Sequence, residues 1–165
     1  MSRSAVLALA PLLLLAACNL APVYAGGSTS APAKLMQQIS VQPIPERAGF
    51  LVRQNLIDRF GTPPAAAPYR LEVELDDQIV AFGVRGDNSA ARERRTLRAR
   101  YRLVEVASGA VLVDATAGAD AGIDRVSSNY AVVAAEASAL DRLTTDIARQ
   151  IAARIARFAN ASPGR

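Results

Sequence analysis

Two hydrophobic periodicities alternate along this chain, and they predict most of its secondary structure. Residues 35–44 mix apolar and polar side chains and end in Pro-Ile-Pro, which predicts a first strand. Residues 46–60 repeat apolar positions three to four apart and are followed by a glycine and two prolines, which predicts an amphipathic helix. A strand and a helix are therefore expected before the central part of the chain.

Residues 69–84 alternate as a half-buried strand does, but the alternation changes phase in the middle. Apolar residues occupy odd positions up to Leu75 and even positions from Val80 onward. A one-residue bulge at Asp76-Asp77 would produce this shift. Adjacent carboxylates also occur in acid–base sites, but neighbours in a strand point to opposite faces, so a solvated bulge is favoured.

A polar connection and two more strands are expected next. Residues 85–95 are mostly polar and predict the connection. Residues 96–106 and 110–120 alternate regularly, with an extension of the second strand to about Val126 left open, and Ser108-Gly109 between them is typical of a two-residue hairpin turn. These two strands are therefore expected to pair as an antiparallel hairpin.

The period then becomes helical over residues 130–158, and Ser128 or Asn129 is suited to cap the helix. Such a helix is roughly 43 Å long and can cover the apolar face of the long strands. A membrane-surface helix is the alternative, but the polar face lacks a dense basic row, so core packing is favoured. The apolar stripe comprises Tyr130, Val133, Ala137, Leu140, Ile147, Ile151, Ile155 and Phe158, with Leu143 at its edge.

The elements follow in the order β-α-β-β-β-α. They predict an α+β fold, a two-layer sandwich in which a four-stranded sheet carries two helices on one face. The other face of the sheet bears charged side chains and is expected to point outward.

The N terminus has the layout of an export signal. Arg3 precedes an apolar run over residues 5–15, which is shorter than the roughly 20 residues that span a bilayer. Residues 15–18, Leu-Ala-Ala-Cys, then place small side chains before a thiol, which is typical of a bacterial lipobox. Cys18 would thus become the lipid-bearing first residue of the mature protein. A plain signal peptide with an incidental cysteine is the alternative.

We therefore expect four segments. A signal peptide covers residues 1–17, a lipidated flexible tether 18–33, the α+β domain 34–159 and a short tail 160–165. The tether is rich in Ala, Pro, Gly, Ser and Thr, and it spans on the order of 20 Å on average.

The amino-acid composition excludes the commonest catalytic and metal-binding side chains. The 165 residues include no histidine, and Cys18 is the only cysteine. The usual general base and the usual metal ligands are therefore missing, and we expect no enzyme activity, no metal and no cofactor. A periplasmic hydrolase that uses carboxylates alone is the remaining enzymatic alternative. The net charge of +4 comes largely from arginine, and export leaves lipid phosphates or an acidic protein surface as anionic partners.

Arginines form a row on the outward face of the strand over residues 96–106. Arg98, Arg100 and Arg102 repeat every second position, about 6.6 Å apart, and are candidates for an anion-binding strip. Cross-strand pairing is the competing interpretation, and the two are compatible if the pairs open for a ligand. The carboxylates available for pairing are Glu72, Glu74, Asp114 and Asp120.

Several motifs resemble the LptE family of lipopolysaccharide-assembly lipoproteins, in its alphaproteobacterial form. The lipobox is followed closely by Pro-Val-Tyr at residues 22–24, the first helix contains Val-Arg-Gln-Asn-Leu from residue 52, and the last helix opens with Ser-Asn-Tyr-Ala from residue 128. The resemblance extends over the whole chain, and the order of strands and helices carries much of it. Asn-Leu at residues 19–20 departs from the Gly-Phe that family members often have there.

The resemblance implies a lipid-anchored outer-membrane protein that faces the periplasm and sits in the LptD β-barrel. There it would act as plug and assembly aid and contact lipopolysaccharide on its way to the cell surface. The resemblance assigns no single contact residue, so Arg98, Arg100 and Arg102 are candidates for lipopolysaccharide binding from strand geometry alone. An auxiliary lipoprotein of an ABC-type lipid transport system is the alternative function.

Overall fold

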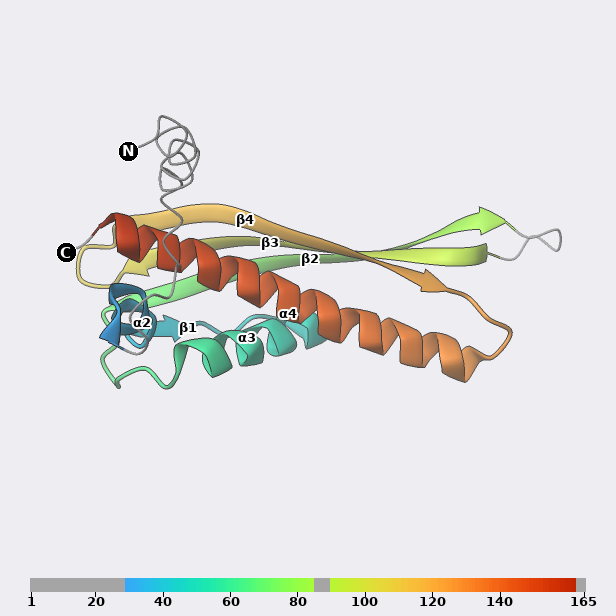
Figure 1. Ribbon diagram of the computed structural model, residues 1–165, viewed down its shortest axis with the longest axis horizontal. Helices are drawn as coiled ribbons and strands as arrows, with labels where there is room; N and C mark the ends of the chain where they lie inside the picture. Colours follow the sequence, from blue (N-terminus) through green and yellow to red (C-terminus); the bar gives the residue numbers. More distant parts are fainter. Residues whose placement is uncertain (1–28, 85–89, 163–165) are drawn as a thin grey trace, which may run out of the picture.

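The computed structural model describes residues 29–84 and 90–162 as a sheet with helices on one face (Figure 1). The elements are α2 (Ala31–Met36), β1 (Ile39–Val41), α3 (Glu46–Phe60), β2 (Tyr69–Val84), β3 (Ala90–Glu105), β4 (Val111–Asp124) and α4 (Asn129–Ala161). The strand order is β1-β2-β3-β4, with β1 parallel to β2 and the other pairs antiparallel. The predicted two-layer α+β fold is confirmed, and the short helix α2 is an addition to it.

The strand expected over residues 35–44 is wrong for most of its length, because a helix precedes it. The hydroxyl oxygen of Ser30 accepts a hydrogen bond from the Ala33 amide at 3.3 Å, and Pro32 lies in the first turn of α2. Pro32 and Met36 are buried, so the packed domain begins before the expected boundary and includes the end of the expected tether. Only residues 39–41 form a strand, β1, which pairs with the start of β2.

Helix α3 has the bounds that the sequence predicts and packs through the predicted face. Val52 and Leu56 are fully buried, and Phe60 is 2% exposed. Gly61 follows with a φ of 83°, which glycine adopts without strain, and its N–H donates to the Ile57 carbonyl at 2.8 Å. The helix thereby ends cleanly and packs against β1, β2 and α4.

Strands β2 and β3 keep one register over their whole length, so the bulge predicted at Asp76-Asp77 is wrong. The apolar positions change phase because, along the β2–β3 pair, the apolar side chains move from one face of the sheet to the other. Asp77 points toward the helices and pairs with Arg95, whereas Val80 and Phe82 point outward and remain 58% and 41% exposed.

The connections around β3 also differ from those expected. The polar connection over residues 85–95 is shorter than predicted, because β3 begins at Ala90. The loop to β4 spans residues 106–110 rather than two residues, and Gly109 there has a φ of 70°. The alternation over residues 110–120 predicts that Val111 points inward together with Val113, Ala115 and Ala117. A register shift between the Val104–Val111 and Leu103–Val113 rungs leaves Val111 exposed instead.

Helix α4 extends slightly beyond the predicted helix at both ends, with Ser128 as its cap. From Leu140 onward the predicted apolar stripe is buried, with Phe158 partly buried, which confirms core packing over membrane-surface binding for this part. The first turns differ, because Val132 faces the sheet there. Tyr130 and Val133 are therefore 85% and 63% exposed, against the prediction.

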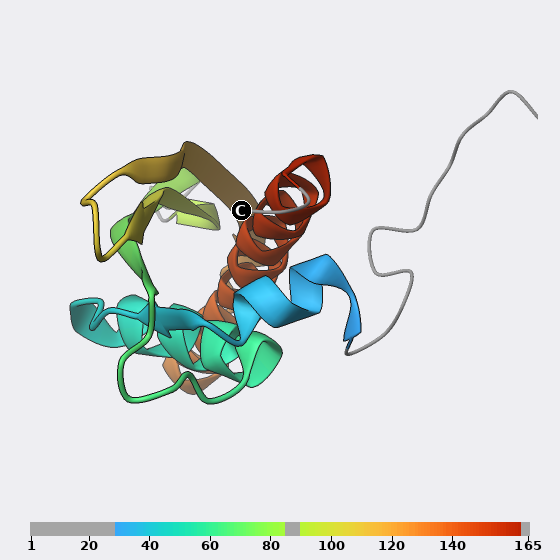
Figure 2. The ribbon, with the colours of Figure 1, turned by 90° about the vertical axis from the view of Figure 1, so that its left-hand side faces the viewer.

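The molecule is long because β2, β3 and α4 run along its whole length (Figure 1). Viewed from one end, the helices cover one side of the sheet (Figure 2). The sheet face away from the helices is termed the outer face and the covered one the inner face. The proximal end holds residues 31 and 162; the distal end is where β2 leads to β3 and β4 leads to α4. Within residues 29–84 and 90–162, no helix has the length and apolar character needed to cross a membrane.

Candidate functional site

The arginine row lies on the outer face of β3, as expected, and each arginine meets a carboxylate on a neighbouring strand. The nitrogen–oxygen distances are 3.3 Å for Arg98–Asp120, 3.2 Å for Arg100–Asp114 and 3.1 Å for Arg102–Glu72. Glu74 lies opposite Arg100 in the β2–β3 register. The structure thus contains the cross-strand pairs that the sequence offers as one interpretation, and the three arginine side chains stay about half exposed.

Asp114, Asp120 and Arg100 in this network have shifted pKa values. A hydrogen bond from Arg100 lowers the pKa of Asp114, and the same contact raises the pKa of Arg100. The Thr96 hydroxyl, which donates to Asp120 at 2.7 Å, is the main cause that lowers the pKa of Asp120, and Arg98 adds to it. Because all these groups face water, their ion pairs are weak and salt-sensitive, and another anion can replace the carboxylate.

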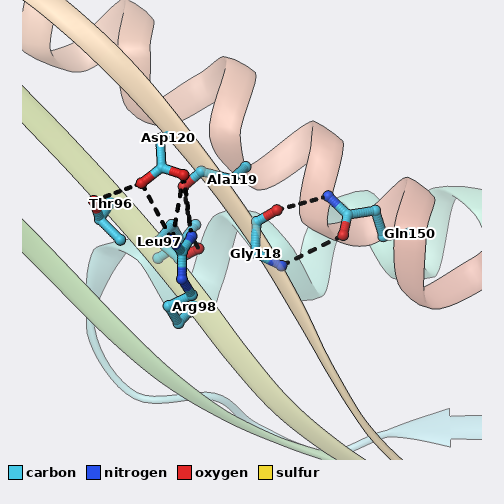
Figure 3. A network of polar contacts seen from close by, with 7 residues as sticks. All are labelled: Thr96, Leu97, Arg98, Gly118, Ala119, Asp120 and Gln150. Carbon is cyan, nitrogen blue, oxygen red and sulfur yellow. Dashed lines mark hydrogen bonds and ion pairs between the residues drawn. The ribbon is translucent and has the colours of Figure 1, made fainter.

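Two residues that the sequence did not single out, Gly118 and Gln150, join this network (Figure 3). The Gln150 side chain on α4 donates to the Gly118 carbonyl at 3.0 Å and accepts from the Gly118 N–H at 3.4 Å. Arg98 lies across Gly118, so that a β carbon there would stand 2.8 Å from its guanidinium. A glycine inside a strand often marks such a close approach, and Gly118 is the one signal in the sequence that could have indicated this contact.

Toward the distal end, the outer face changes from paired charges to apolar side chains. Val80 and Phe82 are exposed on β2, and the Arg94 guanidinium lies 5.5 Å from the centre of the Phe82 ring. Arg94 forms no ion pair with the part of the chain that the structure describes, unlike Arg92 beside it, which pairs with Asp124 at 2.9 Å. A basic group and apolar surface are therefore adjacent at this end.

At the same end the inner face carries charged side chains, which form two ion pairs beneath the segments that cover the sheet. Asp77 and Arg95 are 2.6 Å apart and only 15% and 12% exposed, and Arg95 also donates to the Glu136 carbonyl on α4 at 3.2 Å. The bond with Asp77 raises the pKa of Arg95. Glu93, which is 5% exposed, pairs with Arg125. The Arg95–Glu136 contact attaches the distal sheet to α4, and the Glu93–Arg125 pair attaches it to the connection between β4 and α4.

The predicted lipid attachment site, Cys18, lies outside the described residues, together with the signal peptide and residues 18–28 of the tether. Among residues 29–84 and 90–162, no acidic cluster is arranged to hold a metal ion.

A family model named LptE, with the description Lipopolysaccharide-assembly, matches residues 36–155 of the chain. No curated protein matches the chain. Solved structures share its fold, among them a protein described as a lipoprotein from Caulobacter crescentus CB15, with a TM-score of 0.65 at 21% identity over 79% of this chain and 97% of that one. Lipoprotein B from Nitrosomonas europaea has a TM-score of 0.57 at 14% identity over 74% and 83%. A minor lipoprotein from Acinetobacter baumannii has a TM-score of 0.56 at 16% identity over 72% and 90%.

Proposed function

Because the chain belongs to the LptE family of lipopolysaccharide-assembly lipoproteins, we propose that it is the lipoprotein subunit of the lipopolysaccharide translocon. It plugs an LptD-type β-barrel, assists the assembly of that barrel, and contacts lipopolysaccharide without performing catalysis. The observation that carries the proposal is the outer face of the sheet, which offers arginines held by weak ion pairs along its length and basic and apolar groups together at its distal end.

The anchor is the lipid on Cys18, which holds the protein in the outer membrane with the domain in the periplasm. Each buried methylene contributes about 0.8 kcal/mol, so a diacylglycerol group with a further acyl chain gives stable attachment. The small residues after Cys18 lead to α2, which places the proximal end of the domain nearest the membrane.

The ligand contact uses Arg98, Arg100 and Arg102 on the outer face. A phosphate carries more charge than a carboxylate and accepts two parallel hydrogen bonds from a guanidinium, so it competes with the aspartate partners. Beyond the row, Arg94 has no carboxylate partner among the described residues and lies beside the exposed Phe82. Lipopolysaccharide has phosphates next to acyl chains, and this pairing of a cation with apolar surface fits it.

The paired charges also suit the inside of a barrel. The lumen of an outer-membrane barrel is polar, and in several barrels it is plugged. An outer face whose charges are already compensated can rest against such a wall without leaving an unpaired charge in the contact. The long, narrow domain in Figure 1 has the shape that insertion along a barrel axis requires.

Purification from detergent-solubilised outer membrane tests the complex. A large β-barrel should co-purify with the lipidated protein. Permease components of an inner-membrane ABC system in its place would favour the auxiliary lipoprotein, and the proposal would then be wrong.

Replacement of the arginine row tests the ligand contact. The triple variant Arg98→Gln, Arg100→Gln, Arg102→Gln should stay folded and enter the barrel complex, but bind purified lipopolysaccharide more weakly and with a shallower salt dependence. The matched control removes the same charge from exposed helix positions, with Arg47→Gln, Arg59→Gln and Arg157→Gln. Equal affinities and equal salt slopes in both triple variants would assign the row to cross-strand pairing alone. Loss of the complex in the first variant would assign it to the barrel interface.

A further inference from the structure

The outer edge of β4 presents backbone groups that no strand covers. β4 is the last strand in the order, so alternate residues along it point their N–H and C=O away from β3. Gly118 identifies these residues, because both of its backbone groups face α4. By the period of two, Thr116, Asp120 and Gly122 have the same orientation. The edge is thus a row of donors and acceptors over most of the length of β4.

The contact between Gly118 and Gln150 shows which chemistry this edge binds (Figure 3). The Gln150 side-chain amide donates one hydrogen bond and accepts another, as the peptide groups of an adjacent strand do. The Gln150 amide therefore occupies the place that a peptide group of an adjacent strand would take. Among the described residues, the backbone groups of Thr116, Asp120 and Gly122 have no such partner on α4.

There is room for a chain beside this edge. One hollow of about 610 Å³ extends over the outer face from Glu74 on β2 across Arg98 on β3, and it reaches the β4 edge at Thr116, Gly118 and Gln150. A second of about 620 Å³ lies farther along β4 and is lined by residues that include Gly122 and Ser138. The missing side chain at Gly122 leaves the backbone of the strand accessible there, and the wall that α4 contributes carries Asp141 and Arg142.

We propose that the β4 edge over residues 114–124 is a docking site where an extended, polar segment of a partner protein adds a fifth strand to the sheet. Main-chain hydrogen bonds supply the affinity in this mode of recognition, and the side chains beside the strand set the preference. A polar segment is the one that fits, because the groove wall carries the charged side chains of Asp141 and Arg142. An apolar segment would cover these two side chains without offering them hydrogen bonds.

The test uses a defined probe, an acetylated octapeptide of alternating threonine and lysine, and amide hydrogen exchange of the protein followed by NMR. When about nine-tenths of the protein is bound, exchange at the Thr116, Asp120 and Gly122 amides should slow about tenfold, since only the unbound fraction exchanges. The Ala117 and Ala119 amides, which face β3, should not change. The same peptide with N-methyl groups on alternate residues cannot donate along one edge and should not protect the protein.

Gly122 offers a matched pair of variants. Gly122→Pro removes the N–H that faces the groove and leaves the β3–β4 ladder intact, so protection by the peptide should be lost. Gly122→Ala keeps the N–H, and a β carbon there has no atom within 4 Å, so protection should remain. Gln150→Ala should extend the protection to the Gly118 amide.

Three results would overturn the proposal. The first is an unchanged exchange rate at the edge amides at millimolar peptide. The second is equal protection by the N-methylated peptide, which needs no variant and stands even if Gly122→Pro lowers the unfolding midpoint. The third is full protection in Gly122→Pro, which would place the peptide elsewhere.

Discussion

Removal of the Asp77 carboxylate should destabilise the protein far more than removal of its neighbour Asp76. Asp77 accepts hydrogen bonds from Arg95 at 2.9 and 2.6 Å, and both side chains are largely enclosed between the sheet and α4. Asp76 is exposed on the outer face and accepts from the Gln78 side chain at 3.0 Å. In Asp77→Ala, Arg95 stays charged in a poorly hydrated position, with the Glu136 carbonyl as a remaining partner.

The magnitude follows from this geometry. Removal of one member of a buried ion pair typically lowers the free energy of unfolding by about 3–5 kcal/mol. The remaining hydrogen bond from Arg95 and its slight exposure put Asp77→Ala near the lower limit, at about 3 kcal/mol. Asp76→Ala should change stability by less than about 0.5 kcal/mol. Both variants place alanine in β2, so the change in strand propensity is common to them and cancels in the comparison.

Urea unfolding of the two variants at neutral pH measures the difference, and equal midpoints would refute the reasoning. A double variant, Asp77→Leu with Arg95→Met, replaces the pair by apolar side chains and should recover most of the loss, because no charge is then left without its partner. If the double variant is as unstable as Asp77→Ala, the loss arises from packing at this position and the ion pair is not its cause.

Ile147→Ala should lower the free energy of unfolding by about 2–5 kcal/mol, because Ile147 is fully buried in α4, whereas Val133→Ala on the same helix should change it by less than about 0.5 kcal/mol. Equal losses in denaturant unfolding would mean that Val133 is also packed. Asp114 and Asp120 have lowered pKa values, chiefly from the hydrogen bonds of Arg100 and Thr96, so these contacts stabilise the fold above the unfolded pKa of about 4, and this contribution is lost as the pH falls through the lower native values. In acid, the Asn variants of both residues should therefore lose stability less steeply than the wild type in unfolding series at falling pH. Cys18→Ser should prevent lipid attachment, and mass spectrometry of the membrane-extracted wild type should find the modified residue at Cys18; an unmodified Cys18 would contradict the lipobox.

The elements with strong periodicity could be predicted from the sequence, and those fixed by local caps or distant partners could not. The bounds of α3 and β2 follow from long apolar repeats and flanking breakers, and both are confirmed. Helix α2 is too short to show a period, and its signals are the cap at Ser30 and the proline after it. The bulge prediction is wrong for another reason. A charge on the inner face needs a partner, and the partner of Asp77 is Arg95 on the next strand, which the alternation within residues 69–84 does not reveal.

The candidate site could likewise be predicted from the sequence only in part. A period of two suffices to place Arg98, Arg100 and Arg102 on one face, and it also names the carboxylates opposite them. The contact between Gly118 and Gln150 depends on how α4 lies along β4, which no local pattern encodes. The exposed position of Tyr130 has a similar origin, because the rotation of α4 about its axis is set by the packing of its later turns.

The two faces of the long ribbon exchange polarity along its length, and this exchange connects stability with the proposed function. In the proximal part the inner face is apolar and the outer face carries paired charges. In the distal part the inner face carries the Asp77–Arg95 and Glu93–Arg125 pairs, and the outer face carries Val80 and Phe82. A hydrophobic inner face would bury the distal end equally well, but enclosed pairs demand one geometry, because Asp77 on β2 must stay opposite Arg95 on β3 and the Glu136 carbonyl on α4 must stay beside Arg95. The distal ribbon is thereby held in place while its apolar residues remain on the surface. The exposed apolar side chains beside Arg94 are the surface that the proposed contact with lipopolysaccharide would cover.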